Sequence, residues 1–131
     1  MILGVGVDLV DIDRMERLLA QKWSERFVSR VFTPEEIASC RVSPFPAQCF
    51  AARFAAKEAL VKALGTGFSR GIRPAHIDLR GGERNRPSIR LTGAARSVAD
   101  SMNAGQIHVS LTHTRSAACA VVLVEEKVRD K

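Results

Sequence analysis

Aromatic side chains are scarce in this chain. Of its 131 residues, six are Phe, one is Trp and none is Tyr. Proteins that bind single-stranded nucleic acid stack bases on several aromatic side chains, so we do not expect such a platform here. Cysteine is sparse too, with three residues and no Cys-x-x-Cys pair. Because the count is odd and unclustered, we expect reduced thiols at Cys40, Cys49 and Cys119, and neither a disulfide framework nor a zinc site.

The sequence also lacks a long hydrophobic run. Its N-terminal segment ILGVGVDLVDID is short, is interrupted by acids and has neither a basic leader nor a cleavage site. We therefore expect no signal peptide or membrane span, a cytoplasmic location and no membrane partner. Lys and Arg outnumber Asp and Glu by 20 to 14, for a net charge of +6. That charge favours an acidic partner, such as nucleic acid, an anionic membrane, a polyphosphate ligand or an acidic protein.

Hydrophobic patterning predicts one α+β domain over residues 1–131. Residues 2–9 alternate as a strand, with the glycines Gly4 and Gly6 and the acid Asp8 on one face. Bare glycines on that face let another backbone or a ligand approach closely. We expect a mostly antiparallel sheet of about five strands, packed against a long helix and shorter helices. The further strands are expected at 76–80, 88–91, 107–113 and 117–125, and the helices from 13, from 33, over about 47–64 and from 92.

The long helix contains the most informative pair, Glu58 and Lys62, and should end at Gly65. At about 100° per residue, Glu58 lies at the edge of the apolar stripe, which consists of Phe50, Phe54, Val61 and Leu64. A carboxylate there can hold a divalent cation, and a lysine one turn later can reach phosphate oxygens bound to that cation. The alternative is an ordinary surface ion pair, with Gly65 as a plain helix cap.

Asp8 is the second candidate, because a lone acid within a strand is disfavoured. It could instead mark the end of the strand, while Asp11 and Asp13 are interpreted as turn and cap residues. A Mg²⁺ site needs one or two carboxylates and completes its octahedron with water and phosphate oxygens, and Asp8 with Glu58 supplies that number. His113 and Thr114, at the expected hairpin turn, suit either phosphate binding or a polar turn.

Three segments together resemble a known family. They are GVGVDLVDIDR at 4–14, FAARFAAKEALVKALGTG at 50–67 and HVSLTHTRSAACAVV at 108–122. In order and spacing they look like the holo-[acyl-carrier-protein] synthases, the short, single-copy class of 4′-phosphopantetheinyl transferases. The resemblance implies transfer of 4′-phosphopantetheine from coenzyme A to a serine of acyl carrier protein, with release of adenosine 3′,5′-bisphosphate, in fatty acid biosynthesis.

By the same resemblance, Asp8 and Glu58 hold Mg²⁺ on the coenzyme A pyrophosphate and Lys62 contacts the phosphates. Glu58, directly or through a metal-bound water, takes the serine proton. The resemblance places the remaining coenzyme A contacts at Arg53, His113 and Thr114 for the 3′-phosphate, Gly65 beside the nucleotide, and Asn85, Arg86 and Pro87 beside the adenine. The family commonly has Gly-Lys-Pro in that last loop, so Asn85-Arg86 departs from its pattern.

The resemblance also implies two protein contacts. A basic helix would dock an acidic helix of acyl carrier protein, and its positions here are Arg14, Arg17, Lys22 and Arg26, which could otherwise be a solvated face. Short relatives form homotrimers with each site between two protomers.

Two other functions remain possible from the residues alone. A basic nucleic-acid-binding module explains the charge but not the acids Asp8 and Glu58, which repel phosphates unless a cation intervenes. A non-catalytic oligomeric scaffold would need neither of those acids. We expect the transferase, with no nucleic-acid partner.

Overall fold

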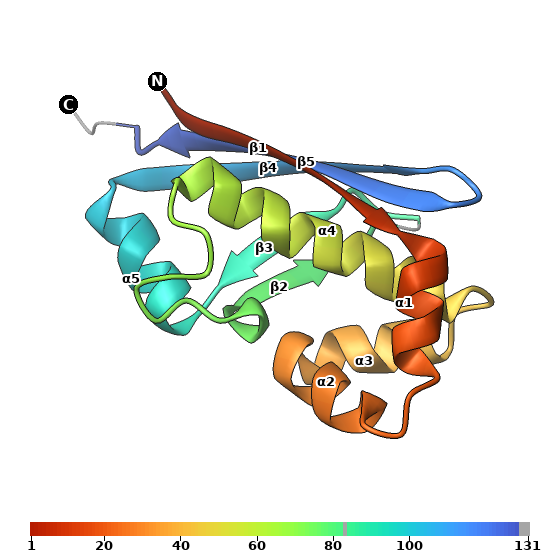
Figure 1. The fold of residues 1–131 in the computed structure, drawn as a ribbon. Coiled ribbons are helices and arrows are strands. Elements are labelled where there is room, and N and C mark those ends of the chain that lie inside the picture. The colour runs from red at the N-terminus through yellow and green to blue at the C-terminus, as the bar shows by residue number, and fades with distance from the viewer. Residues whose placement is uncertain (83, 129–131) are drawn as a thin grey trace.

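The computed structural model describes residues 1–82 and 84–128, and its elements are shown in Figure 1. In chain order they are β1 (Ile2–Asp11), α1 (Ile12–Leu19), α2 (Ser24–Val31), α3 (Pro34–Arg41), α4 (Pro46–Leu64), the 3-10 turn η1 (Pro74–His76), β2 (Ile77–Arg80), β3 (Ser88–Leu91), α5 (Gly93–Ser101), β4 (Ala104–His113) and β5 (Ala117–Glu126). The α+β class is confirmed. Within the described part of the chain, no helix is both long and apolar enough to cross a membrane.

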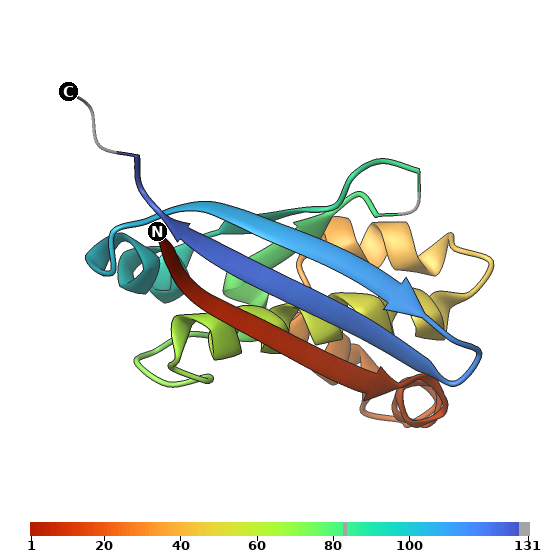
Figure 2. The same cartoon turned by 90° about the horizontal axis from the view of Figure 1, so that it is seen from above.

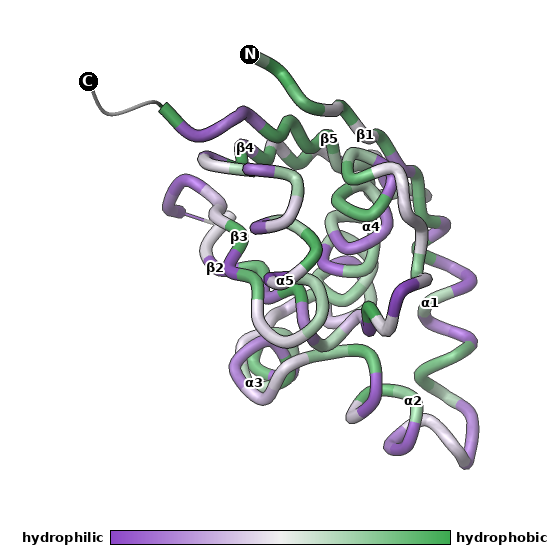
Figure 3. Tube along the Cα trace, turned by 90° about the vertical axis from the view of Figure 1, so that its left-hand side faces the viewer, coloured by the Kyte–Doolittle hydropathy of each residue, from purple (hydrophilic) through white to green (hydrophobic). Residues whose placement is uncertain are grey.

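All the paired strands are antiparallel, as predicted, but they form two sheets rather than one. One has the order β1-β5-β4, and the other is the β2–β3 hairpin. Helix α4 runs along the inner face of the three-stranded sheet (Figures 1 and 2). Hydrophobic residues are concentrated on α4 and on the strands above it (Figure 3), and α4 is buried on most of its circumference because it packs against both the sheet and the shorter elements.

The close contact between β1 and α4 depends on glycine. A Cβ atom at Gly6 would lie 1.9 Å from the carbonyl oxygen of Ala59, and one at Gly4 would lie 1.9 Å from that of Ala63. No larger residue fits there, so the prediction that the glycine face admits another backbone is confirmed. The opposite face of β1 is exposed, and Val7 on it is 57% accessible.

Helix boundaries follow local capping signals, with two corrections. Thr33 and Glu36 form the predicted capping box of α3, and α4 ends at Gly65 in the left-handed conformation, φ 76°. Helix α1 begins earlier than predicted, because Asp11 rather than Asp13 is its N-cap and accepts a bond from the Asp13 backbone nitrogen. Helix α2 was not predicted, and no side chain caps its start.

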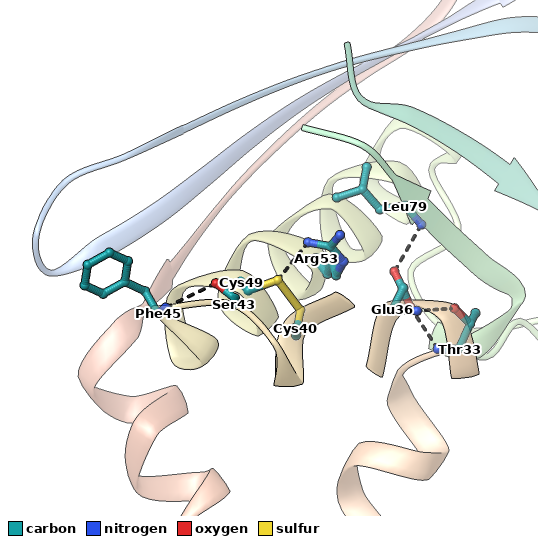
Figure 4. Close-up of a disulfide and its surroundings, with 8 residues drawn as sticks. All are labelled: Thr33, Glu36, Cys40, Ser43, Phe45, Cys49, Arg53 and Leu79. Carbon is teal, nitrogen blue, oxygen red and sulfur yellow. Dashed lines mark hydrogen bonds between the residues drawn. A yellow bond between two sulfur atoms is a disulfide. The ribbon is translucent and has the colours of Figure 1, made fainter. Parts of the chain in front are cut away.

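The cysteine prediction is wrong for two of the three residues. Cys40 at the end of α3 and Cys49 in the first turns of α4 form a disulfide, with their Cα atoms 5.3 Å apart (Figure 4). No sequence signal marks this pairing, because it depends on how close α3 and α4 bring the two residues in space. Cys119, on β5, is a free thiol.

A buried ion pair joins α3 to α4. Lys57 Nζ lies 2.7 Å from Glu36 Oε1, and both side chains are fully buried. The same ammonium donates to the carbonyls of Pro74 and Ile77, while Glu36 Oε2 accepts from the backbone nitrogen of Leu79 at 3.0 Å. Burial lowers the pKa of Lys57 and the attraction of Glu36 opposes that change. The pair connects α4 to the start of β2.

Candidate active site

Asp8 lies near the end of β1, on the same face as the glycines, so its carboxylate points toward α4. Its side chain is mostly buried, with 16% accessible, and Oδ1 is 2.9 Å from Lys62 Nζ. Lys62 also donates to the carbonyl oxygen of Val7 at 3.1 Å. The ammonium therefore binds Asp8 and not Glu58, one turn earlier on its own helix. This arrangement rules out the plain Glu58–Lys62 surface pair and places a cation on Asp8.

Glu58 lies half-buried on α4, at the edge of the buried face as predicted. Burial raises the pKa of Glu58, and the negative charge of Asp8 raises it further, while Lys62 lowers it. The two carboxylates therefore repel each other, and both line one groove between β1, α1 and α4. The hydrogen bond that Lys62 donates to Asp8, and the charge of Asp8, raise the pKa of Lys62.

The donor set fits a small divalent cation. Two carboxylates destabilise each other in a partly desolvated groove, and one of them already binds an ammonium group. A divalent ion would relieve that repulsion, and Mg²⁺ is often held by one or two carboxylates plus water and phosphate oxygens. No cluster of three or more metal-binding side chains occurs among the described residues. An ion at Asp8 and Glu58 would therefore need oxygens from a ligand and from solvent.

A second pocket lies where the N-terminal half of α4 meets the end of β4. Arg53 and His113 both line it, beside Gly81 and Gly82 from the β2–β3 loop. Arg53 is only 5% accessible. Its Nη1 donates to the sulfur of Cys49 at 3.1 Å, and its buried Nε has no hydrogen-bond partner among the described residues. A buried guanidinium with so few acceptors favours an anion in this pocket.

The other predicted nucleotide contacts, Asn85, Arg86, Pro87, Thr114 and Gly65, do not line this pocket. Asn85, Arg86 and Pro87 lie in the β2–β3 loop, where the carbonyl of Asn85 accepts from the backbone of Gly82 at 2.9 Å. Thr114 lies outside the pocket lining. Its hydroxyl accepts a hydrogen bond from the backbone nitrogen of Ala117, at 3.1 Å, in the hairpin turn. Gly65 is exposed one turn beyond Lys62, at the other end of α4.

Among the described residues, none lines both pockets. Glu58 and Arg53 are five positions apart on α4, which separates them by about 140° around the helix axis. The carboxylates therefore lie on one side of α4 and the anion pocket on another.

The predicted basic helix is divided among three segments. Arg14 and Arg17 lie on α1, Lys22 in the turn after it and Arg26 on α2, and all four are exposed. The continuous helix expected for them is wrong, because α1 ends at Leu19. Arg14 lines the carboxylate groove, so this surface continues from that groove.

The sequence did not reveal the apolar lining of the carboxylate groove. Phe54, assigned from periodicity to the buried stripe, is only partly buried and lines the groove beside Glu58. Met15, Leu18 and Phe27 join it from α1 and α2. In the sequence, these apolar residues have the spacing of a helix face packed on a core. Only the space between the helices in the folded structure shows that they line a groove instead.

Known proteins are similar to this chain in sequence and in fold. A family profile described as the 4′-phosphopantetheinyl transferase superfamily matches residues 4–122. The holo-[acyl-carrier-protein] synthase of Syntrophus aciditrophicus is 46% identical over 125 residues, covering 95% of this chain and 97% of that protein. The crystal structure of the Neisseria meningitidis synthase has a TM-score of 0.86 at 29% identity, covering 96% of this chain and all of that one. The Helicobacter pylori synthase, solved in complex with coenzyme A, has a TM-score of 0.79 at 30% identity, covering 92% and 99%.

With the family profile spanning most of its length and relatives matching it almost end to end, the chain belongs to the 4′-phosphopantetheinyl transferase superfamily, among the holo-[acyl-carrier-protein] synthases.

Proposed function

We propose that this enzyme transfers 4′-phosphopantetheine from coenzyme A to a serine of apo acyl carrier protein, with Mg²⁺ held by Asp8 and Glu58. The observation that carries the proposal is the convergence of these carboxylates, from β1 and α4, in one groove with Lys62 bound to Asp8. Relatives named holo-[acyl-carrier-protein] synthase, one of them solved with coenzyme A, support the substrates.

In the reaction, the serine hydroxyl of the carrier attacks the phosphorus that bears the pantetheine arm. The bond from that phosphorus to the bridging pyrophosphate oxygen breaks, and adenosine 3′,5′-bisphosphate leaves. Mg²⁺ would supply stabilisation of the charge that develops on the pyrophosphate. Glu58, directly or through a water, accepts the serine proton. Lys62, released from Asp8, donates to the phosphate oxygens.

Coenzyme A would be held at its other end by the pocket of Arg53 and His113. The guanidinium forms a fork of donors suited to a phosphate, and Arg53 lines that pocket. Asn85, Arg86 and Pro87 would approach the adenine from the β2–β3 loop, with Thr114 and Gly65 as further contacts.

A complete site in this proposal needs two protomers, because the two pockets lie on different sides of α4. The outer face of the three-stranded sheet is uncovered in Figure 2, and it exposes Val5, Val7, Leu9 and Val121. An apolar sheet face of this kind is typical of an interface between subunits, and we propose a homotrimer. Light scattering should give a trimer for the wild type and a smaller species for Val7→Glu. A wild-type monomer at assay concentrations would contradict this part.

The exposed arginines and lysine near the carboxylate groove would attract an acidic carrier protein. Arg14 lies in the groove, and Arg17, Lys22 and Arg26 continue the surface along α1 and α2. Complementary charge raises the rate of association and makes it salt-dependent. Charge reversal at Arg26 should therefore raise KM for the carrier protein with little change in KM for coenzyme A.

Mass spectrometry of apo acyl carrier protein tests the function directly. Incubation with this protein, coenzyme A and Mg²⁺ should add one phosphopantetheine group, EDTA should prevent it, and added Mg²⁺ should restore it. Asp8→Asn and Glu58→Gln should each lower kcat by about 100-fold or more, while Asp13→Asn, an exposed acid outside the groove, should not. If the carrier gains no mass while another transferase modifies it, the proposal is wrong.

A further inference from the structure

The disulfide Cys40–Cys49 lies against the anion pocket. Cys49 lines that pocket, while Cys40 is fully buried behind it. Cys49 Sγ accepts the hydrogen bond from Arg53 Nη1 at 3.1 Å, as Figure 4 shows. The sulfur that forms the disulfide is therefore also an acceptor for the guanidinium expected to bind a phosphate.

The charge on that sulfur depends on its oxidation state. In the disulfide it is neutral and a weak acceptor, so the positive charge of Arg53 stays available to an anion. After reduction, the neighbouring guanidinium favours the thiolate form of Cys49. A thiolate in the position of this sulfur forms an ion pair with Arg53 and competes with phosphate for the same donors.

The disulfide also shapes the pocket wall. It ties the end of α3 to the first turns of α4 and closes the segment 41–48. Ser43, Pro44, Phe45 and Gln48 in that segment line the pocket, and Ser43 Oγ accepts from the Phe45 backbone nitrogen at 3.1 Å. Reduction releases this wall, so both effects weaken anion binding.

We propose that Cys40 and Cys49 form a redox switch at the anion pocket. The pocket binds phosphate tightly when the two cysteines form the disulfide and weakly when the disulfide is reduced. The inference rests on the proposed function in identifying the anion as the 3′-phosphate of coenzyme A. Intracellular disulfides, when present, are often redox-sensing.

The switching reaction is thiol–disulfide exchange with a dithiol reductant. One thiolate of the reductant attacks Cys49 Sγ, the sulfur that faces the pocket, and the Cys40 thiolate leaves. The second thiol of the reductant then releases Cys49. Two electrons and two protons pass to the protein, giving two thiols and the disulfide of the reductant.

The decisive measurement is calorimetric binding of adenosine 3′,5′-bisphosphate to the wild type before and after reduction by dithiothreitol. Reduction should weaken binding by about tenfold, the lower range for loss of one charge-assisted hydrogen bond. KM for coenzyme A should rise in parallel. Equal affinity in the two states, or no binding in either, overturns the inference.

Two single variants separate the charge from the constraint. Cys40→Ser and Cys49→Ser break the same disulfide, but only Cys40→Ser leaves a thiol beside Arg53. Its affinity should fall as pH rises through the range in which the thiol ionises, whereas Cys49→Ser should show no such fall. Identical pH profiles refute the competition at Arg53. Carrier modification by mass spectrometry reports the proposed function separately, since transfer without redox dependence contradicts the switch alone.

Discussion

The buried pair Lys57–Glu36 allows a quantitative prediction. Lys57→Met removes an ammonium that contacts Glu36 at 2.7 Å and leaves a carboxylate with no accessible surface. Breaking one side of a buried ion pair costs about 3–5 kcal/mol, because the remaining charge is uncompensated. The carbonyls of Pro74 and Ile77 also lose their donor. Since domains of this size unfold with about 5–15 kcal/mol, the variant should lose a large share of its stability.

Urea denaturation followed by circular dichroism measures the loss. The free energy of unfolding should fall by about 3–5 kcal/mol, and the cost of Lys57→Met should be smaller when Glu36→Gln has already removed the charge. Glu36→Gln keeps an oxygen acceptor for the Leu79 backbone nitrogen, which makes it the suitable background. A loss below about 1 kcal/mol, or an equal loss in the two backgrounds, would show that the pair does not stabilise the fold as described.

Three further predictions concern the site and the helix that carries it. Burial and the charge of Asp8 raise the pKa of Glu58 in the folded protein. The stability that this group contributes is therefore present at pH values below its ordinary pKa and is lost as the pH rises through the raised pKa. Glu58→Gln should therefore raise Tm at pH 7.5 in EDTA, with a smaller gain at pH 4, and an unchanged Tm at pH 7.5 contradicts this. Gly6→Ala should destabilise strongly and lower soluble yield, because its Cβ meets the Ala59 carbonyl at 1.9 Å, and a wild-type Tm would disprove the close packing. Gly65→Ala meets no atom within 4 Å and should cost only about 1–2 kcal/mol for its left-handed backbone, so a loss matching that of Gly6→Ala would contradict the distinction.

Local signals in the sequence were sufficient for most of the secondary structure. Thr33 with Glu36 predicted the start of α3, and Gly65 predicted the end of α4, because caps act within one helical turn. The alternation of β1 predicted its glycine face. Helix α2 was missed, although α4 and α5, which also begin without a side-chain cap, were predicted. The division into two sheets depends on which strands pair in space, and no local pattern records that.

The candidate site also combines features that the sequence predicts with features that only the folded structure reveals. The sequence by itself determined the residue types, Asp8 on a strand and Glu58 with Lys62 on a helix, and the three segments that mark the family. Only the tertiary structure decided that Lys62 binds Asp8, 54 positions away, that Arg53 is buried against Cys49, and that the two pockets lie on different sides of α4. Periodicity and capping are set by neighbours along the chain, whereas ion pairs, disulfides and pockets depend on distances through space, which are fixed when the helices and sheet pack together.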